Sequence, residues 1–352
     1  MKHARLLFIV KYRENYDGSC GYDGTPYSFG GLYYSALLVV EMLNALGIWA
    51  KLVQVCDNNN IDAAVAAWKP TVVIIEGLWV VPSKFAVLQP LHPSVQWVVR
   101  CHSEIPFLAY EGIAMEWLID YVSYRNVSIA SNSQYGTRDF DSIISAANPE
   151  WTQREVEAKV KYLPNWYDSR PIGLGKRLPD GFLDVGCFGA IRPLKNQLIQ
   201  AVAAVEFARL QAKPLRFHVN ERTEQNGDAV LKNLQTLMTK TGNQLVIHKW
   251  KVRPEFLAGM SAMDVGMQVS FSETFDITAA DTAALGIPLV TSNAIVWSTP
   301  LSQADTSNAA SILAKLMLVT GQRKREIIGL NLDGLQDFTA ESEEVWKQFA
   351  HA

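Results

Sequence analysis

The stretch VGMQVSFSETFDITAADTAALGIPLVTS, residues 265–292, reads as a strand, a helix and a second strand in succession. Its first six residues are mostly apolar and read as a buried strand. A helix is expected to begin near Phe275, and it ends at a Gly-Ile-Pro turn that opens the next strand. Because two strands joined through a helix run parallel, this stretch predicts a parallel sheet covered by helices.

The same alternation extends along the whole chain in both directions. In the first half we expect strands at 5–12, 49–55, 71–79, 95–103, 127–133 and 160–164, with helices at 31–46, 61–68, 106–124 and 134–147. In the second half we expect strands at 182–190, 215–220, 244–250, 265–270 and 288–292, with helices starting near Leu194, Gly227, Pro254, Phe275 and Asn308. This pattern is typical of doubly wound α/β domains.

The length of 352 residues suits two domains, and residues 165–181, NWYDSRPIGLGKRLPDG, have the composition of a linker. We predict an N-terminal Rossmann-like domain at 1–166, a C-terminal Rossmann-like domain at 167–338, and a closing helix at 339–352. Thr339 is the expected N-cap of that helix. Two such domains are expected to face each other across a cleft and to bind ligands at the carboxyl ends of their strands.

The composition excludes several classes of protein. The formal net charge is -3, without a basic tail or patch for nucleic acid or anionic lipid. The four cysteines lack disulfide or metal spacing, so we expect them to be reduced. The apolar run at the N-terminus is too short for a signal peptide, and no segment approaches a membrane span. We therefore expect a cytoplasmic protein.

Arg192 and Lys195 lie three residues apart where a strand gives way to a helix, in FGAIRPLKNQ. Free backbone N–H groups at a helix start and two cations could together bind a diphosphate. Such a pair would offset the negative charge that grows on a departing nucleoside diphosphate. The alternative is that both side chains are only solvated at a helix start.

Glu273 and Asp281 are eight positions apart, about 10 Å along a helix axis. That separation is too long for a shared-proton pair and suits two hydroxyl-bearing groups, a sugar and a ribose. The alternative for Glu273 is that it only favours the positive end of the helix. Asp281 lies among alanines that allow close packing, where an unpaired carboxylate would be costly. We therefore favour a functional role for both acids.

Gly30 and Gly31 open the first helix after a long loop, where the backbone could approach a phosphate or a sugar. The pair lacks the full spacing of a dinucleotide fingerprint. In the preceding loop, Tyr16, Tyr22 and Tyr27 could stack on a sugar or base. A surface loop with turn-forming residues is an equal alternative.

His102 follows the fourth strand, at the edge where ligands bind in such sheets. It could contact a donor sugar or orient an acceptor, although a lone histidine is more often structural. The other histidines show no metal-ligand spacing, and no D-x-D motif is present. We expect a metal-independent reaction without a cofactor.

Taken in order, these segments resemble the retaining GT-B glycosyltransferases, the group that includes sucrose synthases, bacterial glycogen synthases and mannosyltransferases. The residues that carry the resemblance are Gly30-Gly31, His102, Leu163-Pro164-Asn165, the run FGAIRPLKN, and the run SFSETFDITAADTAALGIPLV with its two spaced acids. The resemblance covers the chain from end to end. It implies a GT-B fold of two Rossmann-like domains and a nucleotide-sugar donor such as a UDP-sugar.

The resemblance also implies roles for particular residues. Arg192 and Lys195 would bind the donor diphosphate, Glu273 the hydroxyls of the transferred sugar, and Asp281 the ribose. The donor-binding set would further include Gly30, Gly31, Ser272, Thr274 and Phe275, with His102 near the reacting sugar. Such enzymes retain anomeric configuration through an oxocarbenium-like transition state in which the leaving phosphate helps to deprotonate the acceptor.

This sequence departs from the family pattern at the donor loop. The family usually has Glu where Asp281 stands and glycines near Thr274 and Asp276, and Asn165-Trp166 replaces the common Asn-Gly. A shorter acid and two extra side chains put the usual donor sugar in question.

The acceptor is expected to be soluble, because the acidic stretch 104–124 disfavours an anionic membrane surface. The run RCHSEIPFLAYEG resembles glycosyltransferases of tailed bacteriophages, some of which modify hydroxymethylated DNA bases. The acceptor could therefore be a soluble carbohydrate, a small molecule or a flipped hydroxymethylated base. Two other readings remain open: a sugar-nucleotide epimerase or phosphorylase of the same fold, or an inactive scaffold that binds a sugar nucleotide.

Overall fold

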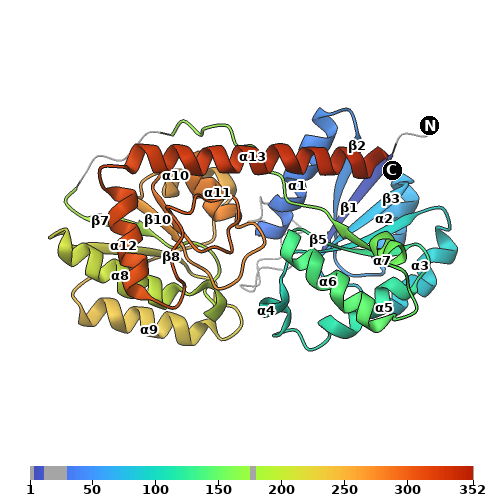
Figure 1. The fold of residues 1–352 in the computed structure, drawn as a ribbon, viewed down its shortest axis with the longest axis horizontal. Helices are drawn as coiled ribbons and strands as arrows, with labels where there is room; N and C mark the ends of the chain where they lie inside the picture. The colour runs from blue at the N-terminus through green and yellow to red at the C-terminus, as the bar shows by residue number, and fades with distance from the viewer. Residues whose placement is uncertain (1–3, 12–29, 175–179, 352) are drawn as a thin grey trace. The chain divides into compact units, whose positions relative to one another are not determined.

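The computed structural model of the protein describes residues 4–11, 30–174 and 180–351 (Figure 1). The chain divides into two compact units. Unit 1 comprises Met1–Asp168 with Thr339–Ala352, and unit 2 comprises Ser169–Phe338. Each unit contains one parallel sheet, and each has its own apolar core.

Unit 1 is built on a six-stranded parallel sheet with the order β2-β1-β3-β4-β5-β6. Its strands are β1 (Arg5–Lys11), β2 (Trp49–Val55), β3 (Val72–Glu76), β4 (Gln96–Cys101), β5 (Val127–Ser131) and β6 (Val160–Tyr162). Its helices are α1 (Gly31–Ala45), α2 (Asn60–Trp68), α3 (Phe85–Leu91), α4 (Ile105–Leu108), α5 (Ala114–Ser123), α6 (Gln134–Ala147) and α7 (Gln153–Lys159), with a 3-10 turn η1 (Pro82–Lys84).

Successive residues of β1 point to opposite faces of this sheet, and both faces are buried. Leu7 and Ile9 pack into a core closed by α2, α3, α5 and α6. Leu6 and Phe8 pack into the other core, which α1 and Trp346 of the last helix close. Because both faces are covered, the strand is apolar throughout, as the sequence pattern predicted.

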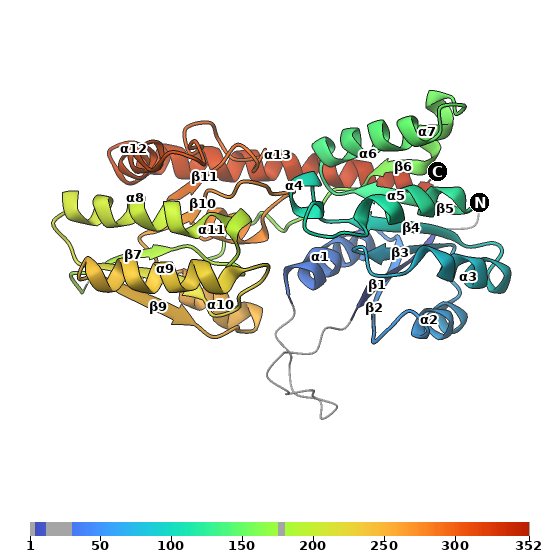
Figure 2. The same ribbon diagram turned by 90° about the horizontal axis from the view of Figure 1, so that it is seen from below.

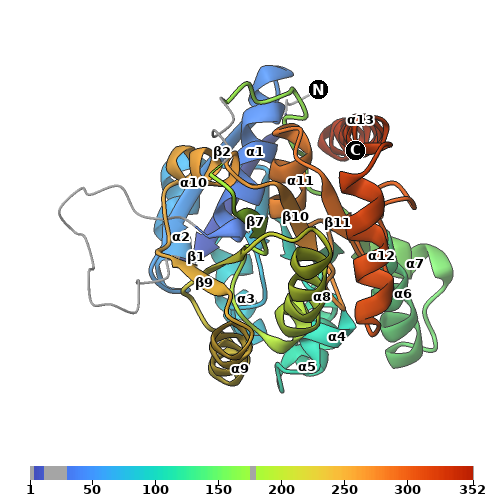
Figure 3. The same cartoon turned by 90° about the vertical axis from the view of Figure 1, so that its left-hand side faces the viewer.

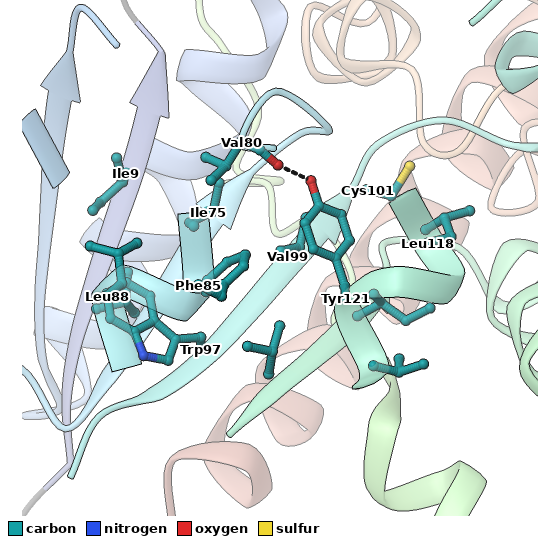
Figure 4. Close-up of a cluster of buried hydrophobic side chains, with 14 of the residues drawn as sticks. Ile9, Ile75, Val80, Phe85, Leu88, Trp97, Val99, Cys101, Leu118 and Tyr121 are labelled. Atoms are coloured by element: carbon teal, nitrogen blue, oxygen red, sulfur yellow. Dashed lines mark hydrogen bonds between the residues drawn. The ribbon is translucent and has the colours of Figure 1, made fainter. Parts of the chain in front are cut away.

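Aromatic rings pack among aliphatic side chains in the first of these cores (Figure 4). The ring of Phe85 lies edge-on to those of Trp97 and Tyr121, with both centroid distances at 5.7 Å. The Tyr121 hydroxyl donates a hydrogen bond to the carbonyl of Val80. A buried tyrosine needs such a partner, and this bond ties α5 to the segment that precedes α3.

Unit 2 is built on a five-stranded parallel sheet with the order β11-β10-β7-β8-β9. Its strands are β7 (Leu183–Gly186), β8 (Leu215–Asn220), β9 (Gln244–His248), β10 (Val265–Gln268) and β11 (Leu289–Thr291). Its helices are α8 (Gln197–Leu210), α9 (Gly227–Lys240), α10 (Arg253–Met260), α11 (Ile277–Ala284), α12 (Ala309–Thr320) and the start of α13 (Lys324–His351), with a 3-10 turn η2 (Pro193–Lys195).

Helices cover both faces of this sheet as well. Helix α8 packs beside α9 (Figure 2) and beside α12 (Figure 3) over the larger core. Helix α11 lies on the other face, where its small residues allow a close approach to the sheet. A Cβ added at Gly266 of β10 would come within 2.6 Å of Thr282. The alanines around Asp281, which are Ala279, Ala280, Ala283 and Ala284, are all buried as well.

The prediction of a single helix at 106–124 is wrong, because the structure has two helices there, α4 and α5. Pro106 lies in the first turn of α4, and residues 109–113, which include Gly112, form turns between the two helices. Helices α3 and α7 were not predicted. Helix α7 begins with a capping box between Thr152 and Glu155, a signal that the sequence contains. Helix α8 begins at Gln197, after the turn η2, rather than near Leu194.

The predicted start of the closing helix is also wrong. Helix α13 begins at Lys324, and Thr339 lies inside it with its hydroxyl donating to the carbonyl of Tyr167 at 3.1 Å. Gly334, which weakens the helical pattern, is required by packing, because a Cβ there would lie 2.1 Å from the carbonyl oxygen of Trp297. Among the described residues no helix, α13 included, is long and apolar enough to cross a membrane.

Candidate active site

The strand order of unit 2 brings two loops together at the carboxyl edge of its sheet. The chain runs outward from β7 to β8 and β9, then returns to the other side of β7 for β10 and β11. Strands β7 and β10 are thus neighbours whose following connections run in opposite directions. In open α/β sheets, ligands bind at this switch point.

The loop after β7 is held in place by side-chain amides. Asn196 has a left-handed backbone, with φ of 57°, and its amide donates to the carbonyls of Val269 at 3.0 Å and Thr306 at 2.7 Å. Gln200 donates to the carbonyl of Lys195 at 2.8 Å and accepts from the backbone of Val269 at 2.9 Å. These bonds fasten the Lys195 loop to the loop that follows β10.

Lys195 lies between two carboxylates from that second loop. Its Nζ is 2.5 Å from Oε1 of Glu273 and 3.1 Å from Oδ2 of Asp276. The side chains of Lys195 and Glu273 are 13% and 10% exposed, and that of Asp276 is 1% exposed. Two predicted site residues 78 positions apart therefore meet in one ion cluster.

Asp276 has a second structural task. Its backbone φ is 60°, a left-handed conformation that glycine adopts without cost, and it forms the N-cap of α11. Oδ1 accepts a hydrogen bond from the backbone of Ala279 at 2.9 Å, while Oδ2 contacts Lys195. The side chain at this glycine-like position therefore connects the start of α11 to the lysine.

Because Glu273 and Asp276 both contact Lys195, the pKa values of Lys195 and Glu273 differ from their ordinary values. Burial lowers the pKa of Lys195, but the charges of Asp276 and Glu273 outweigh it and leave that pKa above its ordinary value. Burial raises the pKa of Glu273, and the negative charge of Asp276 raises it further, against the opposing effects of Lys195 and Arg192. Glu273 is therefore easier to protonate than an ordinary glutamate.

Arg192 is part of the same electrostatic group. Its charge acts on both Lys195 and Glu273. It also lies 3.6 Å from Glu224, which in turn pairs with Arg222 at 2.7 Å. The structure therefore brings Lys195 and Glu273 into contact and places Arg192 where its charge acts on both.

Asp281 lies one and a half turns beyond Asp276 on α11, and its carboxylate is paired. Its Oδ1 and Oδ2 accept from Arg253 at 2.5 Å and 3.2 Å, and the Asp281 side chain is 2% exposed against 19% for Arg253. Asp281, which the family resemblance assigned to the ribose, is thus covered by the guanidinium of Arg253. The sequence analysis did not identify Arg253.

The other residues of the donor loop differ in what they contact. Phe275 is buried, with its ring 6.2 Å from Trp297 and 5.2 Å from Phe338, and its carbonyl accepts from the indole of Trp297. This side chain is a core residue of unit 2. Ser272 is also buried, whereas Thr274 is partly exposed.

His102 belongs to a separate cluster in unit 1, at the carboxyl ends of β3, β4 and β5. Its Nε2 bonds to Glu76, and its Nδ1 lies 3.3 Å from the amide of Asn132. Burial and the charge of Arg100 lower its pKa, so the ring is neutral at physiological pH. With Nε2–H directed to Glu76, Nδ1 is the acceptor of this histidine.

Gly30 is the N-cap of α1, and Gly31 is its first residue. The backbone of Gly30 has an ordinary φ of -70°, and an added Cβ would meet no described atom within 4 Å. The predicted loop tyrosines Tyr16, Tyr22 and Tyr27 lie outside the described residues.

Sequence reasoning missed several charged residues of these clusters, among them Glu76, Asp276 and Arg253. Glu76 ends a buried strand, so the rule that selected His102 would also have selected it. Asp276 could have been found as an N-cap, since an aspartate before a helical run is a start signal. Arg253 gives no local signal of its pairing with Asp281, which is 28 positions away. In the described part of the chain, no cluster of three or more His, Cys, Asp or Glu could hold a metal ion.

Comparison of sequences finds no match, whereas comparison of structures finds proteins of similar fold. No protein-family model and no curated sequence matches the chain. HepE of Anabaena, solved with UDP and glucose, is similar over 99% of both chains at 13% identity, with a TM-score of 0.66. A UDP-forming α,α-trehalose-phosphate synthase from Burkholderia xenovorans is similar over 99% of both chains at 11% identity, also with a TM-score of 0.66.

An apo structure of OtsA is similar over 99% of both chains as well, at 11% identity and with a TM-score of 0.70. At such identities the likeness concerns the fold. The predicted α/β architecture with two parallel sheets is confirmed, and the chain has the GT-B fold of glycosyltransferase structures.

Proposed function

We propose that this protein is a glycosyltransferase that moves a sugar from a nucleoside-diphosphate sugar, with UDP as the expected nucleotide, to a hydroxyl acceptor. One observation carries the proposal: Lys195 and Glu273 meet 2.5 Å apart at the switch point of unit 2, within the field of Arg192. The structural neighbours are consistent with it, since one was solved with UDP and glucose and another is named as a UDP-forming synthase.

The proposed roles follow from the charges of Lys195, Arg192 and Glu273 and from their positions at the carboxyl edge of the sheet. Lys195 and Arg192 would stabilise the negative charge that develops on the departing diphosphate, which needs cations already in position. Glu273 would accept hydrogen bonds from hydroxyls of the transferred sugar. Because these cations neutralise the leaving group, we propose a reaction that uses the nucleotide-sugar as co-substrate and needs neither a cofactor nor a metal ion.

We assign Asp281 to the nucleotide only through Arg253. With both carboxylate oxygens bonded to that guanidinium, Asp281 holds and orients Arg253, whose side chain is the more exposed of the two. This assignment modifies the direct ribose contact that the family resemblance implied.

We further propose that the anomeric configuration is retained and that the leaving phosphate assists deprotonation of the acceptor, as the family resemblance implies. His102, neutral and oriented by Glu76, is proposed to lie beside the acceptor and to help orient it. The proposed acceptor is soluble, in the cytoplasm. A hydroxymethylated DNA base of bacteriophage type is the specific candidate, beside soluble carbohydrates and small molecules.

The test is a thermal-shift screen with UDP-, GDP-, ADP- and TDP-sugars, followed by an assay for release of free nucleotide. A ligand that binds only the folded state raises the melting temperature by mass action. The proposal expects a shift and slow nucleotide release with one donor class. Lys195→Ala should lose both responses, whereas the exposed Lys213→Ala should keep them. Absence of both responses in the wild-type protein with every donor would contradict the proposal.

The acceptor can then be tested with the donor that the screen identifies. Duplex and single-stranded DNA containing hydroxymethylcytosine are incubated with that donor, beside unmodified DNA of the same sequence. A mass increase of one sugar on the modified DNA alone supports the base as acceptor. Transfer to soluble sugars, with none to DNA, would reject the base and keep the transferase.

A further inference from the structure

The charge balance of the Lys195 cluster conflicts with simple binding of a diphosphate. The ion pairs that join these loops contain three cations, Lys195, Arg192 and Arg222, and three acids, Glu273, Asp276 and Glu224. In the described part of the chain, the positive charge of these pairs is therefore already matched by acids. The diphosphate of a sugar nucleotide adds two negative charges beside carboxylates that are largely withdrawn from water, where like charges repel strongly.

Asp276 cannot easily release the lysine. Its carboxylate is 1% exposed, one oxygen caps α11, and its backbone is held in the left-handed region. Moving it away from Lys195 would also disrupt the start of the helix. The geometry of the cap therefore keeps the Asp276 side chain beside Lys195 Nζ.

Glu273 is the acid whose protonation state can change. It lies in the loop before α11, contacts Lys195 through Oε1, and has no capping role. The charges that face it are Lys195 from η2, Arg192 from the preceding loop, and Asp276 from the cap of α11. Cys187, which follows β7, is buried beside Lys195 and Asp276, and burial raises its pKa to about 12, so this thiol stays uncharged. Burial and the charge of Asp276 both raise the pKa of Glu273, so this carboxyl takes up a proton more readily than an ordinary glutamate.

We infer that the donor diphosphate binds to this cluster together with one proton, which the Glu273 carboxylate takes up from solvent to become a carboxylic acid. Asp276 is the positioning residue that fixes Lys195 and imposes this requirement. The inference rests on the proposed function, since it concerns how the same site receives its donor. A protonated Glu273 gains an O–H donor and keeps an acceptor, so it could both give and receive a hydrogen bond with sugar hydroxyls.

The experiment is titration calorimetry of UDP-glucose binding, in pairs of buffers with different ionisation enthalpies, between pH about 6 and about 8. UDP-glucose suits this purpose because its diphosphate is bonded at both ends and keeps the same charge across that range. In wild-type protein we expect uptake of up to one proton, with affinity falling by up to about tenfold for each pH unit.

Two variants test whether Glu273 is the group that takes up the proton. Glu273→Gln should bind without this uptake, with an affinity that hardly changes with pH and exceeds that of wild type at about pH 8. Asp276→Asn keeps a capping oxygen and tolerates the left-handed backbone, but removes one charge. It should bind severalfold more tightly than wild type at about pH 8 and take up less of a proton. Glu255→Gln, an exposed acid in the first turn of α10, is the matched control and should behave as wild type.

The outcomes separate the two proposals. Binding of UDP-glucose without proton uptake, or uptake that persists unchanged in Glu273→Gln, would overturn the inference and leave the proposed function standing. No binding of UDP-glucose at any pH would overturn both, because the inference depends on that function.

Discussion

The two units place charged clusters at the same kind of position, the carboxyl ends of parallel strands, but build them differently. In unit 1 the Arg100–Glu76 pair has no exposed side-chain surface, with Arg100 Nη1 at 3.0 Å from Glu76 Oε1. In unit 2 the Lys195–Glu273 pair keeps about a tenth of each side chain exposed. The Arg100–Glu76 pair is closed to solvent, and the Lys195–Glu273 pair retains access.

The bonding of the two cations explains this difference. Arg100 uses all its donors inside the protein, to Glu76, the carbonyls of Leu163 and Pro164, and the side chain of Asn165. The same Pro164 carbonyl accepts from the indole of Trp346 in α13. Arg100 therefore fastens the end of the sheet and the last helix, and a buried guanidinium with every donor used is a structural residue.

Among the described residues, by contrast, the Lys195 ammonium contacts the acids Glu273 and Asp276, and a lysine is a compact charge that a phosphate can also approach. Mutations should therefore affect the two pairs differently. Loss of the Arg100–Glu76 pair should reduce stability, and loss of the Lys195–Glu273 pair should reduce activity.

The largest expected effect is on stability, from Arg100→Ala. Removal of the guanidinium leaves Glu76 buried without its main partner, which costs about 3 to 5 kcal/mol of folding free energy. Chemical denaturation followed by circular dichroism measures the loss. The double variant Arg100→Met with Glu76→Gln removes both charges and should recover part of it. A change below about 1 kcal/mol in Arg100→Ala would show that the cluster is not structural.

Lys195→Ala should reduce activity instead. If Lys195 neutralises the leaving diphosphate, its loss removes about 2 to 4 kcal/mol of transition-state stabilisation. Steady-state kinetics with the identified donor measure this as a fall in kcat/KM of about 30- to 1,000-fold. The exposed Lys213→Ala is the control. Turnover at the wild-type rate in Lys195→Ala would remove the proposed role.

In the same kinetic experiment Glu273→Gln should lower the rate of transfer without weakening nucleotide binding. Equal loss of transfer and of nucleotide binding would mean that Glu273 does not contact the sugar.

Acid should destabilise unit 2 through a third cluster, at His218. This buried ring bonds to Asp184 at 2.8 Å, and burial lowers its pKa to about 4. Since the unfolded histidine binds a proton at higher pH than the folded one, stability is complete above about pH 6.5 and declines towards pH 4, by about 2 to 3 kcal/mol. Urea midpoints at several pH values test this. His218→Gln should have a flatter profile, and an unchanged slope would assign the acid sensitivity to other groups.

The smallest expected effect on stability is that of Asp276→Ala, which loses the N-cap of α11. A lost cap and an alanine in the left-handed region together cost about 1 to 2 kcal/mol. Asp276→Asn should restore most of this stability because asparagine can cap and adopt the same backbone. The melting temperatures of the two variants give the comparison. Equal melting temperatures for the two would mean that the cap contributes little.

Much of the fold could be predicted because the apolar pattern is local. Strand β1 is a run of consecutive buried residues, and such runs alternating with helical segments indicated two parallel sheets. The start of α13 could not be predicted in this way. Gly334 interrupts the helical pattern for a reason that lies in the tertiary structure, the close approach of the Trp297 carbonyl.

The site could be predicted only in part for a related reason. The rule that ligands bind after parallel strands selected Lys195 and Glu273, and the structure brings them together. The same sequence gave no indication that Asp276 has a left-handed backbone and contacts Lys195, or that Arg253 covers Asp281. Pairings between distant loops depend on packing, and residue spacing does not specify them.

A crystal structure of the protein with UDP-glucose tests most directly whether the Lys195 cluster binds the donor. We expect a diphosphate oxygen within about 3 Å of Lys195 Nζ, with Asp276 still at the lysine and Glu273 directed to the sugar. A diphosphate bound elsewhere, with Lys195 still enclosed by both acids, would contradict that expectation.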